Sequence, residues 1–190
     1  MTERWRCFVA VPIPDELRAD LATAVERWRT DPRTDGLRWA HVSGLHLTLT
    51  FLGGVDPHGV PAVEERIRSV ATGHRPFAVR TGRLGAFHRA GSVRVLWYGV
   101  EDPAGMLSAL AGDLATALDV PLEEAFRPHV SVARARRRPI DLRGWIENAS
   151  LEAPAGTLKV DVLGLMRSHL DGGPARYETL ASIKLSGAPA

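Results

Sequence analysis

Apolar side chains recur every three or four positions in three long stretches of the chain. The first begins at Pro14 or Asp15, and the others follow Pro57 and Pro103. Each pattern places its apolar residues on one face, as in a helix that packs against a core. These residues are Leu17, Leu21, Val25 and Trp28; Val60, Val63, Ile67 and Val70; and Met106 or Leu107, Leu110, Leu114 and Leu118. A shorter helix is predicted over Asp141–Asn148.

Runs rich in β-branched and aromatic residues lie between these helices and predict strands. They are Cys7–Ile13, Leu45–Leu52, Phe77–Thr81, Ser92–Val100, Arg127–Ala133, Thr157–Met166 and Tyr177–Leu185. Some consecutive strands have no helix between them, which favours antiparallel pairing over a doubly wound parallel sheet. The predicted fold class is therefore α+β with largely antiparallel sheets.

One predicted strand has an unusual polar face. From Leu45 to Leu52, leucine and phenylalanine alternate with His46, Thr48 and Thr50. Because residues two apart in a strand share a face, the imidazole and the two hydroxyls are predicted to lie together, opposite a core-facing side. A solvent-facing edge more often carries Lys, Glu or Arg, so this composition favours a polar cleft.

A similar unit returns later in the chain, where His129 and Ser131 share one face and Val130 and Val132 share the other. Two such strands, separated by helices, suggest an internal duplication whose two lobes bring the strands to either side of one groove. A third match, His41-Val42-Ser43, is followed at once by glycine and is predicted to be a loop.

Two imidazoles and two hydroxyls suit the hydrolysis of a cyclic phosphodiester. Histidine titrates near neutral pH, so it can deprotonate water or protonate the leaving alkoxide. Thr and Ser hydroxyls can donate hydrogen bonds to non-bridging phosphate oxygens, and a nearby Arg can add a permanently charged clamp. This chemistry requires neither a metal nor a cofactor, and we expect none.

The composition fits this picture and excludes several classes of protein. The chain has 190 residues, of which 45% are apolar, with a net charge of only +2, so it is neither a disordered tail nor a polybasic binder. A single cysteine, Cys7, excludes an internal disulfide framework. No apolar run approaches a membrane span and the first residues lack a signal-peptide pattern, so we expect a cytoplasmic protein with no membrane contact.

The paired motifs with their flanking residues resemble the 2H phosphoesterase superfamily, and within it the RNA 2′,3′-cyclic phosphodiesterases, which were earlier described as 2′-5′ RNA ligases. The similar segments span nearly the whole chain. They are residues 6–11 (RCFVAV), 46–53 (HLTLTFLG), 94–97 (RVLW), 126–134 (FRPHVSVAR), and 163–168 (LGLMRS) with Tyr177.

The resemblance implies a bilobal α+β fold, with two largely antiparallel sheets and outer helices around a central cleft. It implies one domain, residues 1–190, made of two pseudo-symmetric lobes. It further implies that His46 is the proton donor to the leaving 3′ oxygen and His129 the proton acceptor from water, with a 2′-phosphate as product. Thr48 and Ser131 are expected to bind the phosphate. Ser131 departs from the family, which usually has Thr there, so weaker orientation of the hydroxyl is expected.

The choice of the arginine clamp stays open. Arg134 matches a family arginine, but strict alternation from His129 places it on the opposite face unless the strand bends near Ala133. It could also be a solvated member of the basic run 134–138. Arg127 shares parity with His129 and is the competing clamp. Phe51 matches a motif position that could stack on a base, although alternation favours the core for this ring. Phe8, Trp97 and Tyr177 are expected to be packing residues.

The leading functional hypothesis is a metal-independent enzyme, expected to be monomeric, that hydrolyses terminal 2′,3′-cyclic phosphates on RNA or nucleotides. One alternative is a nucleotide-binding module without turnover. Another is a related enzyme that acts on a different cyclic phosphate or ligates 2′-5′ ends.

Overall fold

The computed structural model describes residues 3–121, 126–136, 140–169 and 175–188. Nine strands form one strongly curved sheet in the order β7-β4-β5-β6-β3-β1-β8-β9, with β2 pairing beside β6. Every strand pairing is antiparallel. The strands are β1 (Trp5–Pro12), β2 (Leu37–Trp39), β3 (His46–Val55), β4 (Phe77–Arg89), β5 (Ser92–Val100), β6 (His129–Ala135), β7 (Gly156–Val160), β8 (Val162–His169) and β9 (Arg176–Lys184).

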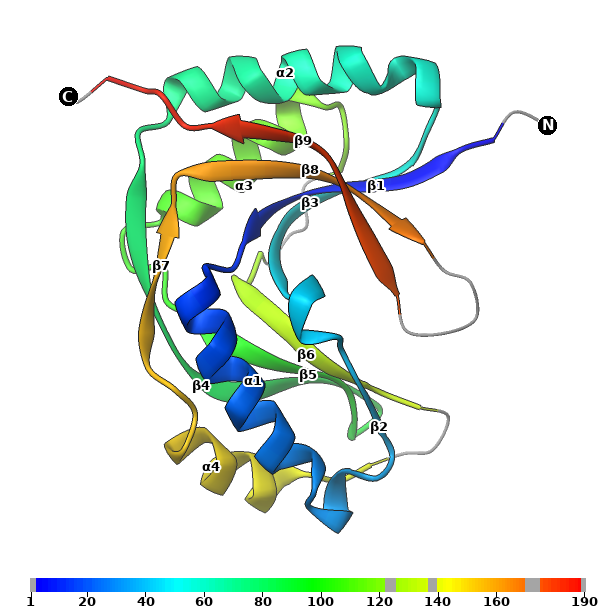
Figure 1. The fold of residues 1–190 in the computed structure, drawn as a ribbon, viewed down its shortest axis with the longest axis vertical. Helices are drawn as coiled ribbons and strands as arrows, with labels where there is room; N and C mark the ends of the chain where they lie inside the picture. The colour runs from blue at the N-terminus through cyan, green and yellow to red at the C-terminus, as the bar shows by residue number, and fades with distance from the viewer. Residues whose placement is uncertain (1–2, 122–125, 137–139, 170–174, 189–190) are drawn as a thin grey trace.

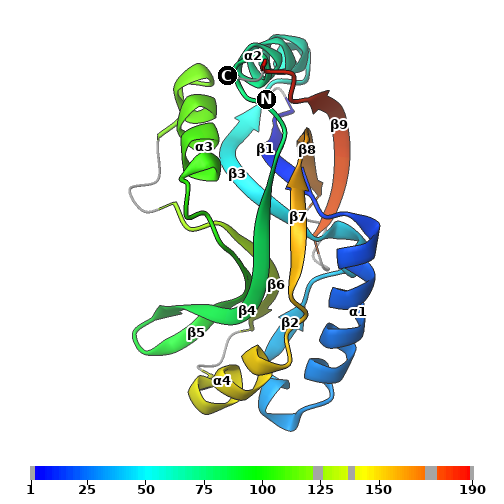
Figure 2. The same ribbon diagram turned by 90° about the vertical axis from the view of Figure 1, so that its left-hand side faces the viewer.

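The sheet consists of two halves that meet between β6 and β3. These two central strands are joined through a single bridged pair, Leu47 with Val130, and both side chains are completely buried. Along the strand order, each half continues outward with three further strands, and β7, the edge strand of one half, leads directly into β8 of the other half (Figure 2). The predicted α+β class and bilobal architecture are confirmed. Two sheets were expected, but the structure has one continuous sheet, because the pair Leu47–Val130 connects the two halves.

Two helices accompany each half of the sheet (Figure 1). Helices α2 (Val60–Gly73) and α3 (Met106–Ala117) pack on the half that contains β3 and β9, whereas α1 (Asp15–Arg29) and α4 (Arg143–Leu151) lie by β7 and β4. All four predicted helices are present. In the described part of the chain, none is long and apolar enough to cross a membrane.

Helix α1 illustrates why these segments are helical. Its first turn carries Asp15 and Glu16 and its last turn Arg27 and Arg29, so charge of each sign lies at the end that the helix dipole favours. Its buried side chains form one stripe at helical spacing, as the sequence predicts. The stripe consists of Leu17, Leu21, Ala24, Val25 and Trp28.

Three strand predictions need correction. Strand β2 was not expected, because three residues after a glycine are too short to show an alternating pattern. Strand β4 continues to Arg89, well beyond the predicted end at Thr81. The predicted strand 157–166 is two strands separated by Asp161, where the chain passes from one half of the sheet to the other.

Candidate active site

The two histidine motifs lie on the two strands that meet at the centre of the sheet. The bridged residues that join these strands directly follow the two histidines. When this antiparallel register is continued by one residue in each direction, His46 lies opposite Ser131, and Thr48 lies opposite His129. Each imidazole therefore faces the hydroxyl residue of the other motif, as an approximate twofold relation between the lobes requires.

Both motifs contain an extra residue three positions after the histidine. On β3 the extra residue is Leu49, because its two neighbours pair with consecutive positions of β1. On β6 it is Val132, because its neighbours pair with consecutive positions of β5. A β-bulge of this kind shifts the alternation, so the residues after it exchange faces.

The bulges explain why simple alternation gives wrong side-chain directions. Thr50, predicted to lie beside His46, is buried with 8% exposure, whereas Phe51, for which alternation favours the core, is 49% exposed. Phe51 lines the same cleft as the histidines. Arg134 also returns to this cleft, where strict alternation from His129 had placed it on the other face. Phe51 and Arg134 are therefore equivalent residues of the two motifs, each five positions after its histidine.

The cleft has a volume of about 510 Å³ and brings together most of the predicted site residues. His46, Thr48, Phe51, His129, Ser131 and Arg134 all line it. Its charged lining among the described residues is basic, since Arg6 and Arg38 join Arg134 and no Asp or Glu takes part. The arrangement favours an anionic ligand between the two motifs.

His46 is held in a fixed orientation between aromatic rings. Its Nδ1 lies 2.7 Å from the carbonyl oxygen of Gly44. Because a carbonyl only accepts hydrogen bonds, Nδ1 carries the proton, and Nε2 is left for a ligand. The ring centroid is 4.8 Å from that of Phe8 and 4.7 Å from that of Tyr177, the latter in an edge-on arrangement.

This enclosure changes the protonation of His46. Burial lowers the pKa of His46 to about 4, opposed by the hydrogen bond to Gly44 and reinforced by the positive charge of Arg134 and by that of His129 when His129 is protonated. In the free protein at neutral pH, His46 is therefore a neutral imidazole. A bound anion would offset the charge of Arg134 and raise the pKa of His46.

His129 has the same type of backbone anchor in a different setting. Its Nδ1 lies 2.7 Å from the carbonyl oxygen of Arg127, so Nδ1 again carries the proton and Nε2 is the nitrogen with the lone pair. The ring meets Phe87 edge-on at 4.9 Å between centroids, and Trp97 lies 6.5 Å away. The two imidazoles thus have the same tautomer, and each lies next to aromatic rings of its own half of the sheet.

The structure separates the two candidate arginines. Arg134 lines the cleft with both histidines, whereas Arg127 lines only a neighbouring hollow of about 340 Å³, which shares His129 with the cleft. The backbone of Arg127 still orients His129 through its carbonyl. Within the basic run 134–138, residues 137–138 lie outside the described residues.

Several cleft residues have no signal in the motifs. Tyr177, expected to be a packing residue, is 37% exposed and lines the cleft next to His46. Phe87, which supports His129, lies in the part of β4 that the strand prediction omitted. His41, in the predicted loop, lies at the start of a short turn, Val42–Gly44, and also lines the cleft. Tyr177 and Phe87 are brought to the motifs by strands distant in sequence, whereas His41 lies only five residues before His46.

The described residues contain no group of three or more His, Cys, Asp or Glu side chains that could hold a metal ion. Two of the remaining histidines pair with carboxylates away from the cleft: His74 with Asp113 at 2.8 Å, and His169 with Glu178 at 3.0 Å. Cys7 is a buried thiol, and burial raises its pKa.

Comparison with known families agrees with the motifs and the fold. The family model described as the 2′-5′ RNA ligase superfamily matches residues 13–172. The chain belongs to this superfamily. One relative, an RNA 2′,3′-cyclic phosphodiesterase of Geobacillus stearothermophilus, is 31% identical over 198 residues, covering 98% of this chain and 59% of the relative. Another of the same name, from Thermotoga maritima, is 28% identical over 185 residues, covering 96% of each chain.

Solved structures of similar proteins have the same fold. A protein of Thermus thermophilus superposes with a TM-score of 0.74 at 26% identity, covering 96% of this chain and 98% of that one. E. coli LigT in complex with 3′-AMP superposes with a TM-score of 0.73 at 25% identity, covering 97% and 99%. The LigT-type 2H phosphoesterase fold therefore extends over nearly the whole chain.

Proposed function

We propose that this protein is a metal-independent phosphodiesterase that opens terminal 2′,3′-cyclic phosphates of RNA to 2′-phosphates. The observation that carries the proposal is the pair of imidazoles with the same tautomer, on register-related strands, in one basic cleft. Two nitrogens that can each exchange a proton, with a basic lining between them, suit acid–base hydrolysis of a phosphodiester.

In this mechanism His129 is the proton acceptor. Its Nδ1–H is bound to a carbonyl, so the Nε2 lone pair takes a proton from water as the water oxygen attacks phosphorus. The P–O3′ bond breaks on the opposite side of phosphorus, because the attacking and leaving oxygens lie roughly in line.

His46 is the proton donor to the leaving O3′. This role requires the imidazolium form, which its enclosure disfavours in the free protein. The substrate phosphate supplies the missing stabilisation, since an anion beside the ring favours the charged form. Proton uptake at His46 is therefore coupled to substrate binding, and the acid forms where it is needed.

The remaining motif residues bind the phosphate. The hydroxyls of Thr48 and Ser131 donate to its non-bridging oxygens, and Arg134 supplies charge-assisted hydrogen bonds. Phe51, exposed on the same cleft, offers an apolar face on which a base can stack. Arg127 contributes through its carbonyl rather than its guanidinium.

The names of relatives support the same reaction. The relatives from Geobacillus stearothermophilus and Thermotoga maritima are named for hydrolysis of RNA 2′,3′-cyclic phosphate. Crystal structures of E. coli LigT contain 3′-AMP and phosphate. These names suit a site built for one phosphate attached to a ribose.

The proposal is tested by incubating the purified chain with adenosine 2′,3′-cyclic phosphate and identifying the product by chromatography against adenosine 2′- and 3′-phosphate standards. Formation of the 2′-phosphate, unaffected by EDTA, is expected. A 3′-phosphate product would reverse the assignment of the leaving oxygen. Tight binding without any product would instead favour a nucleotide-binding module, and joining of 2′-5′ ends in a parallel assay would favour a ligase.

A further inference from the structure

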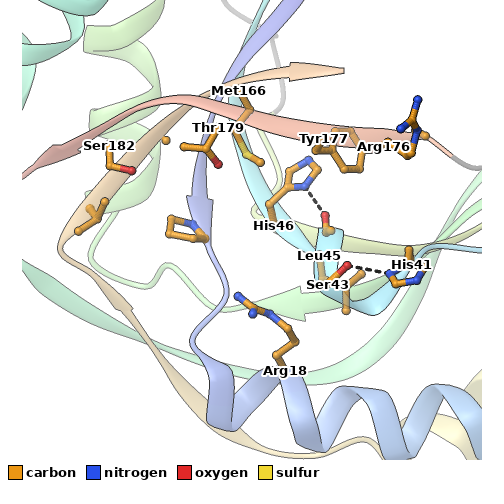
Figure 3. A pocket seen from close by; sticks show the side chains of 15 residues that line it. Arg18, His41, Ser43, Leu45, His46, Met166, Arg176, Tyr177, Thr179 and Ser182 are labelled. Atoms are coloured by element: carbon orange, nitrogen blue, oxygen red, sulfur yellow. Dashed lines mark hydrogen bonds between the residues drawn. The ribbon is translucent and has the colours of Figure 1, made fainter. Parts of the chain in front are cut away.

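A second, larger cavity lies directly beside the catalytic cleft. It has a volume of about 760 Å³ and lies between the start of α1 and strands β8 and β9 (Figure 3). Sites for small-molecule ligands have volumes of about 300–1,000 Å³, so this cavity is large enough for a nucleotide. The mechanism described above uses only one residue of its wall, His46.

The lining is suited to a phosphate joined to a sugar and a base. Arg18 projects into the cavity from α1, whereas Arg176 lies at the far end of the lining on β9, with its guanidinium turned away from Arg18 (Figure 3). Hydroxyls of Ser43, Thr179 and Ser182 face the same space, and none of the described lining residues is acidic. The apolar part of the wall comes from Pro12, Leu45, Val162 and Met166.

Arg18 is held in place by the protein and still has donors to offer. It binds Asp15 at 2.7 Å through one terminal nitrogen and the carbonyl of Ile13 through the other. Its side chain is only 31% exposed, and its buried Nε has no hydrogen-bond partner among the described residues. A guanidinium has five N–H groups, so these two bonds leave donors to spare. A fixed, partly buried cation with spare donors is typical of a phosphate-binding group.

The cavity and the cleft share a wall at the leaving-group side of the reaction. His46, Tyr177, His41 and Gly44 line both spaces. The leaving O3′ belongs to the terminal ribose and departs toward His46, on the side of phosphorus opposite His129. The ribose and the chain attached to its 5′ carbon must therefore extend on the His46 side, where this cavity opens.

We propose that the cavity is a subsite for the nucleotide preceding the terminal one, with Arg18 binding the phosphodiester that links the two. Tyr177, exposed between the two spaces, separates the terminal nucleoside from its neighbour and offers a ring for base stacking. This inference rests on the proposed function and adds a preference for RNA ends over mononucleotides.

The test compares two substrates that differ only in this nucleotide: adenosine 2′,3′-cyclic phosphate and the dinucleotide ApA ending in 2′,3′-cyclic phosphate. The quantity of interest is the ratio of kcat/KM for the dinucleotide to that for the mononucleotide. For the wild-type protein we expect a ratio well above one. Since a charged hydrogen bond to phosphate is lost, Arg18→Gln should lower the ratio about tenfold.

A second variant and a matched control keep the outcome interpretable. Ser182→Trp fills the cavity from β9 without touching Arg18 and should lower the same ratio. Arg29→Gln is the control, because Arg29 lies on the same helix with a similar pairing three residues back, to Glu26 at 2.8 Å, but outside the cavity. It should leave the ratio unchanged.

Equal activity of the wild-type protein on both substrates would overturn the subsite while leaving the proposed hydrolysis intact. The same conclusion would follow if Arg18→Gln and Ser182→Trp lowered both activities by equal factors. Absence of hydrolysis of either substrate by the wild-type protein would instead reject the proposed function, and the subsite with it.

Discussion

The two halves of the active site have the same backbone design but different chemistry. Each has a histidine anchored through Nδ1 to a carbonyl two residues earlier, and each has a bulge three residues after that histidine. The surroundings differ, since His46 is enclosed by Phe8 and Tyr177 whereas His129 meets Phe87 edge-on. A symmetric scaffold thus holds two imidazoles in unequal environments.

The two motifs also differ in the cleft residue that lies two positions after each bulge. The fifth position after the histidine is Phe51 in one motif and Arg134 in the other, and both lie in the cleft. The positive charge of Arg134 acts across the cleft on His46 and helps to lower its pKa. At this position, the His129 motif therefore supplies charge and the His46 motif supplies an apolar surface. This inequality suits a reaction with separate acid and base roles.

Removing either imidazole should have the largest effect. Because acid–base catalysis typically contributes about 10²–10⁴ in rate, His46→Gln and His129→Gln should each reduce kcat for adenosine 2′,3′-cyclic phosphate by a factor in this range. The double variant should lose less than the product of the two factors, because the two groups act in one step. Circular dichroism serves as the folding control. Full activity of both folded single variants would disprove the two-histidine mechanism.

The neutral state of the His46 ring in the free protein is the next prediction. In the free protein, the NMR titration of the His46 ring should have its midpoint near pH 4 and shift upward when inorganic phosphate is added. Arg134→Gln should also raise this midpoint, since a positive charge is removed. A midpoint near the ordinary value of about 6.5 in the free protein would contradict the enclosed, neutral His46.

The same pKa predicts a trend in stability. The unfolded chain takes up a proton at His46 as the pH falls through about 6.5, while the native state does not until the pH is near its lower folded value. Acidification between these values therefore destabilises the native state. His46→Gln should weaken this dependence in urea unfolding measured at pH 7 and pH 5. An unchanged dependence would mean that His46 is not enclosed in the folded protein.

The arginines offer a test with a smaller effect. Loss of charged hydrogen bonds to phosphate predicts that Arg134→Gln lowers kcat/KM by about ten- to hundredfold. Arg127→Gln should change it by no more than a few-fold, because that guanidinium lies in the neighbouring hollow and the carbonyl that orients His129 remains. The reverse order would make Arg127 the clamp and place the phosphate in the neighbouring hollow.

The sequence reveals the repeated motif and most of the elements, because alternation and helical spacing are local patterns. It fails where local patterns are interrupted. The bulges at Leu49 and Val132 exchange the faces of Thr50, Phe51 and Arg134, and their position depends on pairing with neighbouring strands. Phe87 and Tyr177 reach the histidines from distant strands, so no motif spacing could identify them.

The smallest predicted effect concerns the two hydroxyl residues, which face each other's histidines. Thr48 has a β-branched side chain with restricted rotamers, whereas Ser131 rotates more freely. The exchange Ser131→Thr should therefore raise kcat modestly, and Thr48→Ser should lower it, each by about two- to threefold.

Removing a hydroxyl, in Thr48→Val or Ser131→Ala, should lower kcat about five- to tenfold, as expected for the loss of a neutral hydrogen bond. Steady-state kinetics on adenosine 2′,3′-cyclic phosphate measure all four variants. If Ser131→Thr were less active than Ser131→Ala, a methyl group would not be tolerated at this position, and the correspondence between the two motifs would not extend to their hydroxyls.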